Sequence, residues 1–320
     1  WLKQSHCGSR NAIKVPWHRS FVGPSYFQDR LLAVLAFACV ATEMGAVPCT
    51  QCNCPKDGSS KANVVQQYSR SRPGPSEEVD VKTNRELRPE CKLESGATYT
   101  GEWVGSERDG HGVQVWPDGA RFEGQWEAGK VKGQGIFAHS DGDVYEGQWK
   151  DGKAHGNGVY NHADGSKYSG EWLDDHQHGH GVEVWPDGAR YEGGYVNGVK
   201  QGEGLFHWAD GAQFRGSFFQ NNTHGRGEYL WADGRAYTGE WQHSKMHGRG
   251  VFIWPDGKRY EGEYANDLKH GEGEFHWPDH RCYSGQWKEG KQHGIGIYIS
   301  ETGTKRKGQW QEGRRLSWME

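Results

Sequence analysis

The chain repeats itself every 23 residues over more than two thirds of its length, and this period constrains the fold more than any other feature. One copy runs from Tyr237 to Arg259 and reads YTGEWQHSKMHGRGVFIWPDGKR. Tyr237, Gly239 and Trp241 are spaced by two, which places them on one face of a β-strand. The copy therefore opens with a strand that has one aromatic face.

The second half of the copy predicts the partner strand. A polar connector leads to His247, Gly248 and Gly250, and a short strand is expected from Val251 to Trp254. The Pro-Asp-Gly sequence that follows is a turn signal, because glycine accepts the positive φ of a tight turn. Each copy thus predicts one β-hairpin.

The period holds without an insertion and decays only at the end of the chain. The glycine between the two aromatics is invariant from Gly101 to Gly308, while Arg306 replaces the first aromatic of the tenth copy, as in a capping repeat. The first aromatic recurs as Tyr99, Phe122, Tyr145, Tyr168, Tyr191, Phe214, Tyr237, Tyr260 and Tyr283. The second recurs as Trp103, Trp126, Trp149, Trp172, Tyr195, Phe218, Trp241, Tyr264, Trp287 and Trp310.

Tyr-x-Gly-x-Trp, His-Gly-x-Gly and Asp-Gly at this step resemble the MORN (membrane occupation and recognition nexus) repeat, from about Lys92 to Gly313. The resemblance implies an all-β fold, an elongated single-sheet solenoid of stacked antiparallel hairpins. The residues favour the same fold, because a lone hairpin is marginal in water and must bury its aromatic face against its neighbours. At ~4.8 Å per strand, ten hairpins would extend on the order of 95 Å.

Composition agrees with a repeat protein that relies on rings. Apolar residues make up only 33% of the chain, but 13% are aromatic, including 16 Trp. Aromatic side chains bury more area than aliphatic ones and can replace them in a core. The formal net charge of -4 gives no support for a nucleic-acid partner, since such proteins carry an excess of Lys and Arg.

The first 43 residues differ from the rest. The chain begins at Trp1, and its first methionine is Met44. Leu31 to Val40 form an apolar run as long as the hydrophobic region of a signal peptide and too short to span a membrane. Because no methionine precedes it, either the true start is missing or residues 1–43 are an untranslated leader or a disordered segment. We favour the leader, which predicts neither secretion nor a transmembrane segment.

Residues 44–57 resemble a lipid-anchored N-terminus. Gly45 after Met44 fits a myristoylation site, although Cys49 stands where Ser or Thr is usual. Cys49, Cys52 and Cys54 would be palmitoylated, since one acyl chain binds a membrane only marginally. Free thiols in a tail and a zinc site are the alternatives, but three thiolates are one short of a structural zinc site, so we expect no metal.

The remaining boundaries follow from composition. Residues 58–91 are rich in Ser, Lys, Glu and Pro without apolar periodicity and predict a disordered linker. The MORN-repeat domain is expected over 92–320 with a degenerate C-terminal cap. Cys282 is the only cysteine inside the repeats, so no disulfide framework is expected, which favours the cytosol.

We find no catalytic signature in the repeats, and no enzyme, cofactor or metal is predicted. Six histidines occupy one repeat position and predict turn residues that bond the backbone, about 10 Å apart: His155, His178, His224, His247, His270 and His293. His176, His178 and His180 alternate and could project from one side of a strand, which leaves a weak alternative of a metal cluster.

The expected function therefore lies on a surface. A second set of indoles shares one phase after the Gly-x-Gly pair and either packs as core or lines a groove for a protein partner such as a helix: Trp116, Trp185, Trp208, Trp231, Trp254 and Trp277.

We predict a non-enzymatic scaffold that docks proteins at a cytosolic membrane, through an acylated N-terminus that contacts phospholipid, or at a cytoskeletal or flagellar structure. The last two settings are what the resemblance implies. The alternative is a phospholipid-binding regulatory module like the repeats of phosphatidylinositol phosphate kinases, without the kinase domain. Acidic residues such as Glu102 and Glu171 weaken that alternative, because they repel anionic head groups. A homodimer through a repeat end is a further expectation.

Overall fold

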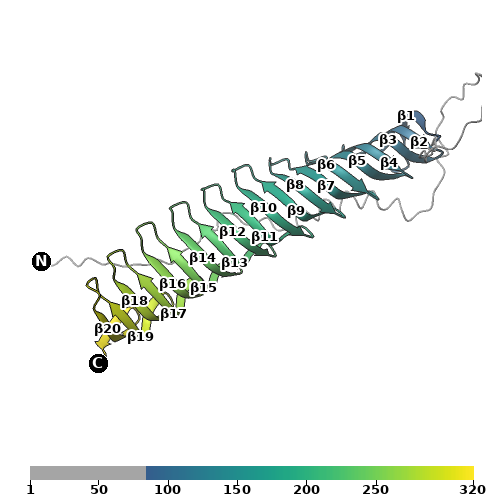
Figure 1. Ribbon diagram of the computed structural model, residues 1–320. Helices are drawn as coiled ribbons and strands as arrows, with labels where there is room; N and C mark the ends of the chain where they lie inside the picture. Colours follow the sequence, from purple (N-terminus) through teal and green to yellow (C-terminus); the bar gives the residue numbers. More distant parts are fainter. Residues whose placement is uncertain (1–83) are drawn as a thin grey trace, which may run out of the picture. The chain divides into compact units, whose positions relative to one another are not determined.

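The computed structural model describes residues 84–320, which consist of strands and turns. These residues fall into two compact parts, 84–153 and 154–320. Within each part, hairpins follow one another in chain order in an open antiparallel sheet (Figure 1). The predicted all-β solenoid of stacked hairpins is confirmed, and no helix in the described part of the chain is long and apolar enough to cross a membrane.

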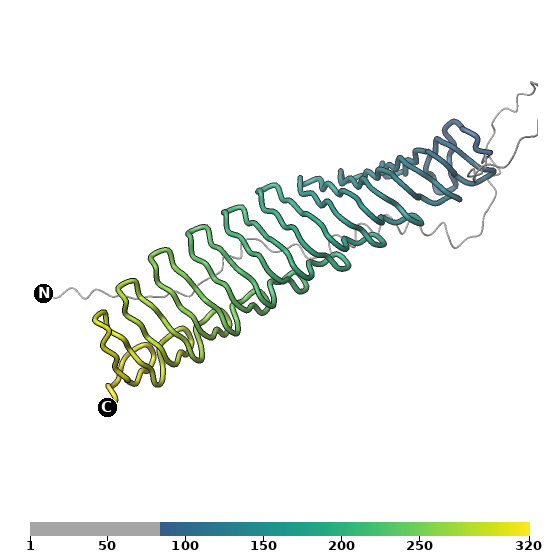
Figure 2. Tube along the Cα trace, viewed as in Figure 1, coloured from purple at the N-terminus to yellow at the C-terminus, as the bar shows by residue number. Residues whose placement is uncertain are grey.

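From β2 to β20 the strands alternate between seven and nine residues, and the Cα trace of each part turns back at regular steps (Figure 2). The first part contains β1 (Glu86–Lys92), β2 (Thr98–Val104), β3 (Glu107–Val115), β4 (Arg121–Glu127), β5 (Lys130–Ala138) and β6 (Val144–Lys150). From the boundary onward follow β7 (Lys153–Asn161), β8 (Lys167–Leu173), β9 (His176–Val184), β10 (Arg190–Val196), β11 (Val199–His207), β12 (Gln213–Phe219), β13 (Asn222–Leu230), β14 (Ala236–Gln242), β15 (Lys245–Ile253), β16 (Arg259–Ala265), β17 (Leu268–His276), β18 (Cys282–Lys288), β19 (Lys291–Ile299), β20 (Lys305–Gln311) and β21 (Arg314–Trp318).

The sheet begins earlier than the sequence predicted. Strand β1 pairs antiparallel with β2, with Cys91 opposite Tyr99. The sequence predicts a linker up to residue 91, because Pro89 and the charged side chains hide the strand. The repeat domain therefore starts at β1, whereas the leader, the lipidation segment and the rest of the linker lie outside the described residues.

One face of the sheet is built from rings that lie over glycine. In the β14–β15 hairpin, Gly239 pairs with Gly250, and the Tyr237 ring covers both of them. A Cβ added to Gly250 would lie 2.5 Å from the Tyr237 ring carbons, so only glycine fits beneath this ring. The Tyr237 hydroxyl donates to the Glu240 carbonyl at 3.0 Å. The period-two glycines predicted from the sequence thus form the floor of the aromatic layer.

The second aromatic of each repeat joins neighbouring hairpins. The Trp241 ring meets Tyr237 edge-on at 5.2 Å and Phe214 of the preceding repeat at 5.4 Å. Its Nε1 donates to the Gly227 carbonyl at 3.3 Å, so the indole satisfies its polar atom on backbone that glycine leaves bare. Edge-to-face contacts of this kind add to the area that the rings bury.

The second strand of each hairpin is longer than predicted. Strand β15 starts at Lys245 and includes the His-Gly-x-Gly sequence, which the sequence analysis placed in a connector. The register shifts between Gly239 and Glu240, because β15 contains a bulge at Gly248 with φ of +58°. Glycine here marks an interruption within the strand and not its end. The predicted strand from Val251 to Trp254 was therefore too short.

The connector between the two strands is only a two-residue turn, shorter than the sequence predicts. His243 and Ser244 have φ of +48° and +62°, as in a hairpin turn of type I′. The turn is bonded to strand β13 of the preceding repeat, since the Ser244 amide donates to the Thr223 carbonyl at 2.9 Å. The turn between repeats is as predicted, because Trp254 closes it with Lys258 and Gly257 has φ of +86°.

The C-terminal end is closed by the degenerate repeat. Strand β21 pairs with β20, and the Trp318 ring lies 6.0 Å from Trp310 and 6.3 Å from Tyr298. Arg306 and Arg315 lie over the Trp318 ring at 5.6 Å and 4.1 Å. Trp318 thereby covers the aromatic layer that a further repeat would otherwise bury.

Candidate docking surface

Five of the six predicted indoles lie in the part formed by residues 154–320, where they form a row that we name the indole stripe. Each follows the second strand of a repeat, on the same face as the aromatic layer. Trp231 is buried, with 5% of its surface exposed, and the other four are half-buried. The stripe consists of Trp185, Trp208, Trp231, Trp254 and Trp277.

Buried rings alternate with the indoles and hold them in place. Trp208 lies between Phe206 and Tyr229, with centroid distances of 4.5 Å and 4.9 Å. Trp254 lies between Phe252 and Phe275 at 4.3 Å and 5.6 Å. Since the inner rings are buried while most indoles are half-exposed, the stripe is an outer layer on the core. The core interpretation of the second aromatic set therefore holds for Trp231, while a groove lined by the half-buried members stays a prediction.

Trp116 belongs to the other part of the chain. It is half-buried and meets the Phe137 ring at 5.4 Å, and Phe137 in turn contacts His139 at 4.5 Å. This indole packs on its neighbouring ring as the members of the stripe do.

Most cations beside the indoles already have partners. Arg235 lies over Trp231 at 5.3 Å, and its Nε donates to Asp233 of the same turn at 2.7 Å. Arg281 over Trp277 is bound in the same way to Asp279. The Asp of the turn between repeats thus neutralises the cation two residues later.

One lysine on this face is paired by a carboxylate in the core. The Lys200 ammonium lies 2.6 Å from Glu183 Oε2, with 7% and 19% of their side chains exposed. Glu183 also accepts the Tyr195 hydroxyl at 2.9 Å. Burial, followed by the charge of Glu183, raises the pKa of Tyr195 far above its usual range. Lys200 also lies 5.1 Å from the Trp185 ring, so the pair adjoins the stripe.

Lys269 occupies the same repeat position as Lys200 but has rings in place of a carboxylate. Its Nζ lies 4.9 Å from Trp254, 4.6 Å from Phe275, 5.2 Å from Tyr260 and 5.1 Å from Trp287. Ring faces attract a cation. Burial disfavours the charged form and lowers the pKa of Lys269 to about 8.

No hydrogen bond or ion pair within residues 84–320 engages the Lys269 ammonium. Because the half-buried Trp254 forms one wall of its cage, the ammonium lies at the stripe. The cage is therefore a place where a carboxylate from outside would find a poorly solvated cation.

Comparison with protein families decides what kind of repeat this is. The MORN repeat matches residues 99–121, 122–144, 145–167, 168–190, 191–213, 214–234, 237–259, 260–280 and 283–305, together more than half of the chain. The chain is a MORN-repeat protein. The family predicted from the Tyr-x-Gly-x-Trp pattern is confirmed.

Other comparisons add little about this MORN protein. No curated protein matches its sequence. Among solved structures, the TCP10 domain of Danio rerio CPAP in complex with a peptide of Danio rerio STIL has 13% identity and a TM-score of 0.40, covering 72% of this chain and 97% of that chain. The SAS-4 (dCPAP) TCP domain of Drosophila melanogaster with a proline-rich motif of Ana2 has 14% identity and a TM-score of 0.32, covering 62% and 99%. These values say nothing of this chain's partners.

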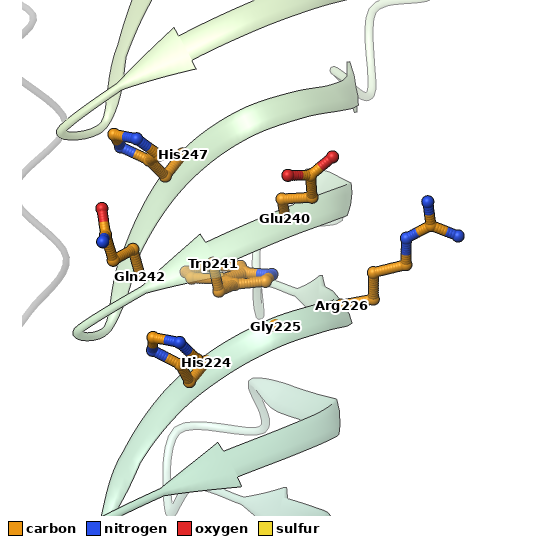
Figure 3. A pocket seen from close by; sticks show the side chains of 7 residues that line it. All are labelled: His224, Gly225, Arg226, Glu240, Trp241, Gln242 and His247. Carbon is orange, nitrogen blue, oxygen red and sulfur yellow. The ribbon is translucent and has the colours of Figure 1, made fainter.

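The opposite face of the MORN sheet carries the histidine column and exposed aliphatic side chains such as Ile253. A shallow hollow of about 420 Å³ lies there, with His224, Gln242 and His247 on one side and Arg226 and Glu240 on the other (Figure 3). Carboxylates of this face accept hydrogen bonds from backbone amides.

Glu102 Oε2 accepts the His111 amide at 2.6 Å, and Glu171 Oε1 accepts the His180 amide at 2.9 Å. The acidic residues that the sequence analysis weighed against lipid binding thus include two that fix the strand bulges.

The predicted role of the histidine column was wrong. His155, His178, His224 and His293 lie within strands and not in turns, because the bulge keeps the chain extended through this position. Their Nδ1 atoms are buried without a hydrogen-bond partner in the described part of the chain.

The other site residues have mixed outcomes. Gly45, Cys49, Cys52 and Cys54 lie outside the described residues, so lipidation stays a prediction. Within residues 84–320, one group of three potential metal ligands has its atoms within 4.8 Å of one another, although no metal site was predicted. It is not the weak alternative of His176, His178 and His180 but consists of Glu274, His276 and Cys282. Sequence reasoning missed it because these residues meet across two strands.

Proposed function

We propose that this MORN protein is a non-enzymatic scaffold that docks a protein partner on the indole stripe, with a carboxylate of that partner bound at Lys269. The unpaired ammonium of Lys269 inside its aromatic cage is the observation that carries the proposal. Where in the cell this docking takes place stays a prediction from the N-terminal sequence.

The stripe has the chemistry of an interface core. Trp is enriched where protein interfaces concentrate their binding energy, because a rigid ring covers a large area with little loss of side-chain entropy. Trp208, Trp254 and Trp277 are half-buried, so the partner would cover rings already held by buried neighbours. Little ordering would then be needed on the MORN side.

The cage favours a protein carboxylate over a lipid surface. A membrane of anionic lipids attracts several cations at once. Beside the stripe, however, Arg235 and Arg281 are already bound to aspartates of their own turns. One free ammonium among rings suits a single carboxylate whose neighbours are apolar, as on one side of a protein segment. The lipid-binding alternative has no comparable observation in its favour.

Site-specific photo-crosslinking in the cell of origin tests the proposal. In the full chain, a benzoylphenylalanine at Trp254 should give an adduct with one protein, and Lys269→Met should reduce it at least tenfold. Methionine is the natural residue at the same position of another repeat, Met246, so this variant keeps its packing. The matched control carries the crosslinker at Ile253, which is exposed on the opposite face.

Adducts of equal yield from Trp254 and Ile253 would contradict a face-specific dock. An adduct at Trp254 that persists unchanged in Lys269→Met would remove the carboxylate from the proposal. Transfer of the label from Trp254 to lipid alone would favour the membrane alternative.

A further inference from the structure

The polar face of the β17–β18 hairpin brings three different metal-ligating side chains together. His276 pairs directly with Cys282 across the two strands, and Glu274 pairs with Ser284. His276 Nε2 lies 4.0 Å from Cys282 Sγ and 3.3 Å from Glu274 Oε2. All three ligand atoms lie within 4.8 Å of one another.

We propose that Glu274, His276 and Cys282 are three ligands of a zinc ion whose fourth coordination position is not filled by a described residue of this chain. Tetrahedral zinc with bonds of about 2.0 to 2.3 Å places a nitrogen about 3.3 Å from an oxygen and about 3.6 Å from a sulfur. The nitrogen–oxygen distance already has this value, and the nitrogen–sulfur distance of 4.0 Å exceeds its value by a few tenths of an ångström. The mixed sulfur, nitrogen and oxygen set suits zinc better than magnesium or calcium.

The internal repeat shows that this combination is particular to one copy. Most other copies carry an aliphatic residue where Glu274 stands, such as Val251. In the copy that contains Glu228, the positions of His276 and Cys282 are filled by Leu230 and Ala236. The three ligands therefore coincide in a single hairpin, although the strand geometry recurs throughout.

The contacts argue for a shared ion and against a nucleophilic triad. In a triad, the base uses one ring nitrogen for the nucleophile and the other for the acid. Here Cys282 and Glu274 both face Nε2 of His276. One ring nitrogen cannot donate a hydrogen bond to a carboxylate and accept one from a thiol at once, but a metal ion bound to Nε2 would contact all three ligands.

The surroundings fit an ion of charge +2. The Ser284 hydroxyl donates to Glu274 Oε1 at 2.9 Å and so orients the carboxylate, as outer partners of metal ligands do. Cys282 is buried, with 7% of its surface exposed. Zinc would displace the thiol proton, and one thiolate plus one carboxylate would then balance its charge. The exposed Glu274 leaves the site open to a water or to a ligand from a partner.

Cobalt substitution gives a direct test on the full chain, with the cysteines outside the described residues replaced by serine. Titration with Co²⁺ should produce a thiolate-to-cobalt charge-transfer band at one equivalent, and Zn²⁺ should abolish it. The serine substitutions are at Cys7, Cys39, Cys49, Cys52 and Cys54.

The ligand variants use residues that other repeats already carry, so folding is preserved. Cys282→Ala should remove the band, and His276→Ile should weaken zinc binding at least a hundredfold. Ser284→Ala should weaken it about tenfold. Glu228→Val is the matched control and should leave binding unchanged, since Glu228 has no such neighbours. Absence of the charge-transfer band, or equal zinc affinity in Cys282→Ala and the parent chain, would overturn the proposal.

Discussion

Lys200 and Lys269 stand at one position of two repeats three periods apart, yet one is paired and the other is caged. Beside Lys200, the core aromatic of a second strand is replaced by Glu183, which supplies a carboxylate at 2.6 Å. The position that corresponds to Glu183 near Lys269 is Phe252, which is fully buried. The same backbone therefore holds a closed ion pair in one copy and an open cation in the other.

The comparison teaches what the aromatic layer can tolerate. A buried charge without a partner is ordinarily costly. Ring faces offset part of that cost at Lys269. A cation retained under these conditions does not maximise stability. Arg108 in the first part is a third case: the Gly129 carbonyl accepts from its guanidinium at 2.6 Å, and burial lowers its pKa to about 10.

The largest effect should follow from breaking the closed pair. Lys200→Met leaves Glu183 in the core without its cation and should destabilise the surrounding hairpins by about 3 kcal/mol. The double variant Lys200→Met, Glu183→Phe should recover most of that loss, because both new residues occur at these positions in other copies, at Met246 and Phe206. Hydrogen exchange of the β10 and β11 amides measures the change locally, which suits an array that need not unfold in one step.

Equal protection in the single and double variants would contradict this prediction, since the carboxylate would then not depend on Lys200. Glu203→Gln provides the control for a loss of charge on a neighbouring exposed side chain, and we expect no change of protection from it.

Replacing the caged Lys269 by methionine should stabilise its hairpin, whereas the same replacement at Lys200 destabilises its surroundings. Lys269→Met removes a charge that has no partner and places an apolar chain among four rings, so it should stabilise β16 and β17 by about 2 kcal/mol. Hydrogen exchange of the amides in these strands is again the measurement. A loss of protection would mean that the rings hold the ammonium better than they hold a thioether, and the contrast between the two lysines would fail.

Much of this fold could be predicted from the sequence, because the 23-residue period places equivalent residues at equivalent positions of every hairpin. The spacing of Tyr237, Gly239 and Trp241 correctly placed the rings on one face. The glycine of the bulge was misread, because a glycine that interrupts a strand and one that ends it look alike in sequence. Left-handed turns at His243 and Ser244 carry no glycine, so their sequence gives little indication of a tight hairpin.

The sites were harder to predict because they depend on neighbours across strands. Lys269 looks like any exposed lysine until the stacking of Trp254, Phe275 and Trp287 is known. Cys282 looks like a lone thiol until the register places it opposite His276. Aligning the copies could have revealed both as departures from the period, but not which residues surround them.

The smallest effect we expect is a pH dependence that separates the two lysines. The pKa of Lys269 in the folded chain is lowered from 10.5 to about 8, so the unfolded chain binds more protons between these values. Stability must therefore rise with pH in that interval, by roughly 1.5 kcal/mol between pH 8 and about pH 9.5. Buried tyrosines such as Tyr99, whose pKa is raised to about 12, act in the opposite direction above pH 10. Hydrogen exchange, corrected for the intrinsic pH dependence of amide exchange, should show this rise in β16 and β17 and its loss in Lys269→Met. If the variant and the parent chain share one pH profile, the caged ammonium keeps its proton throughout, and the ring faces outweigh burial.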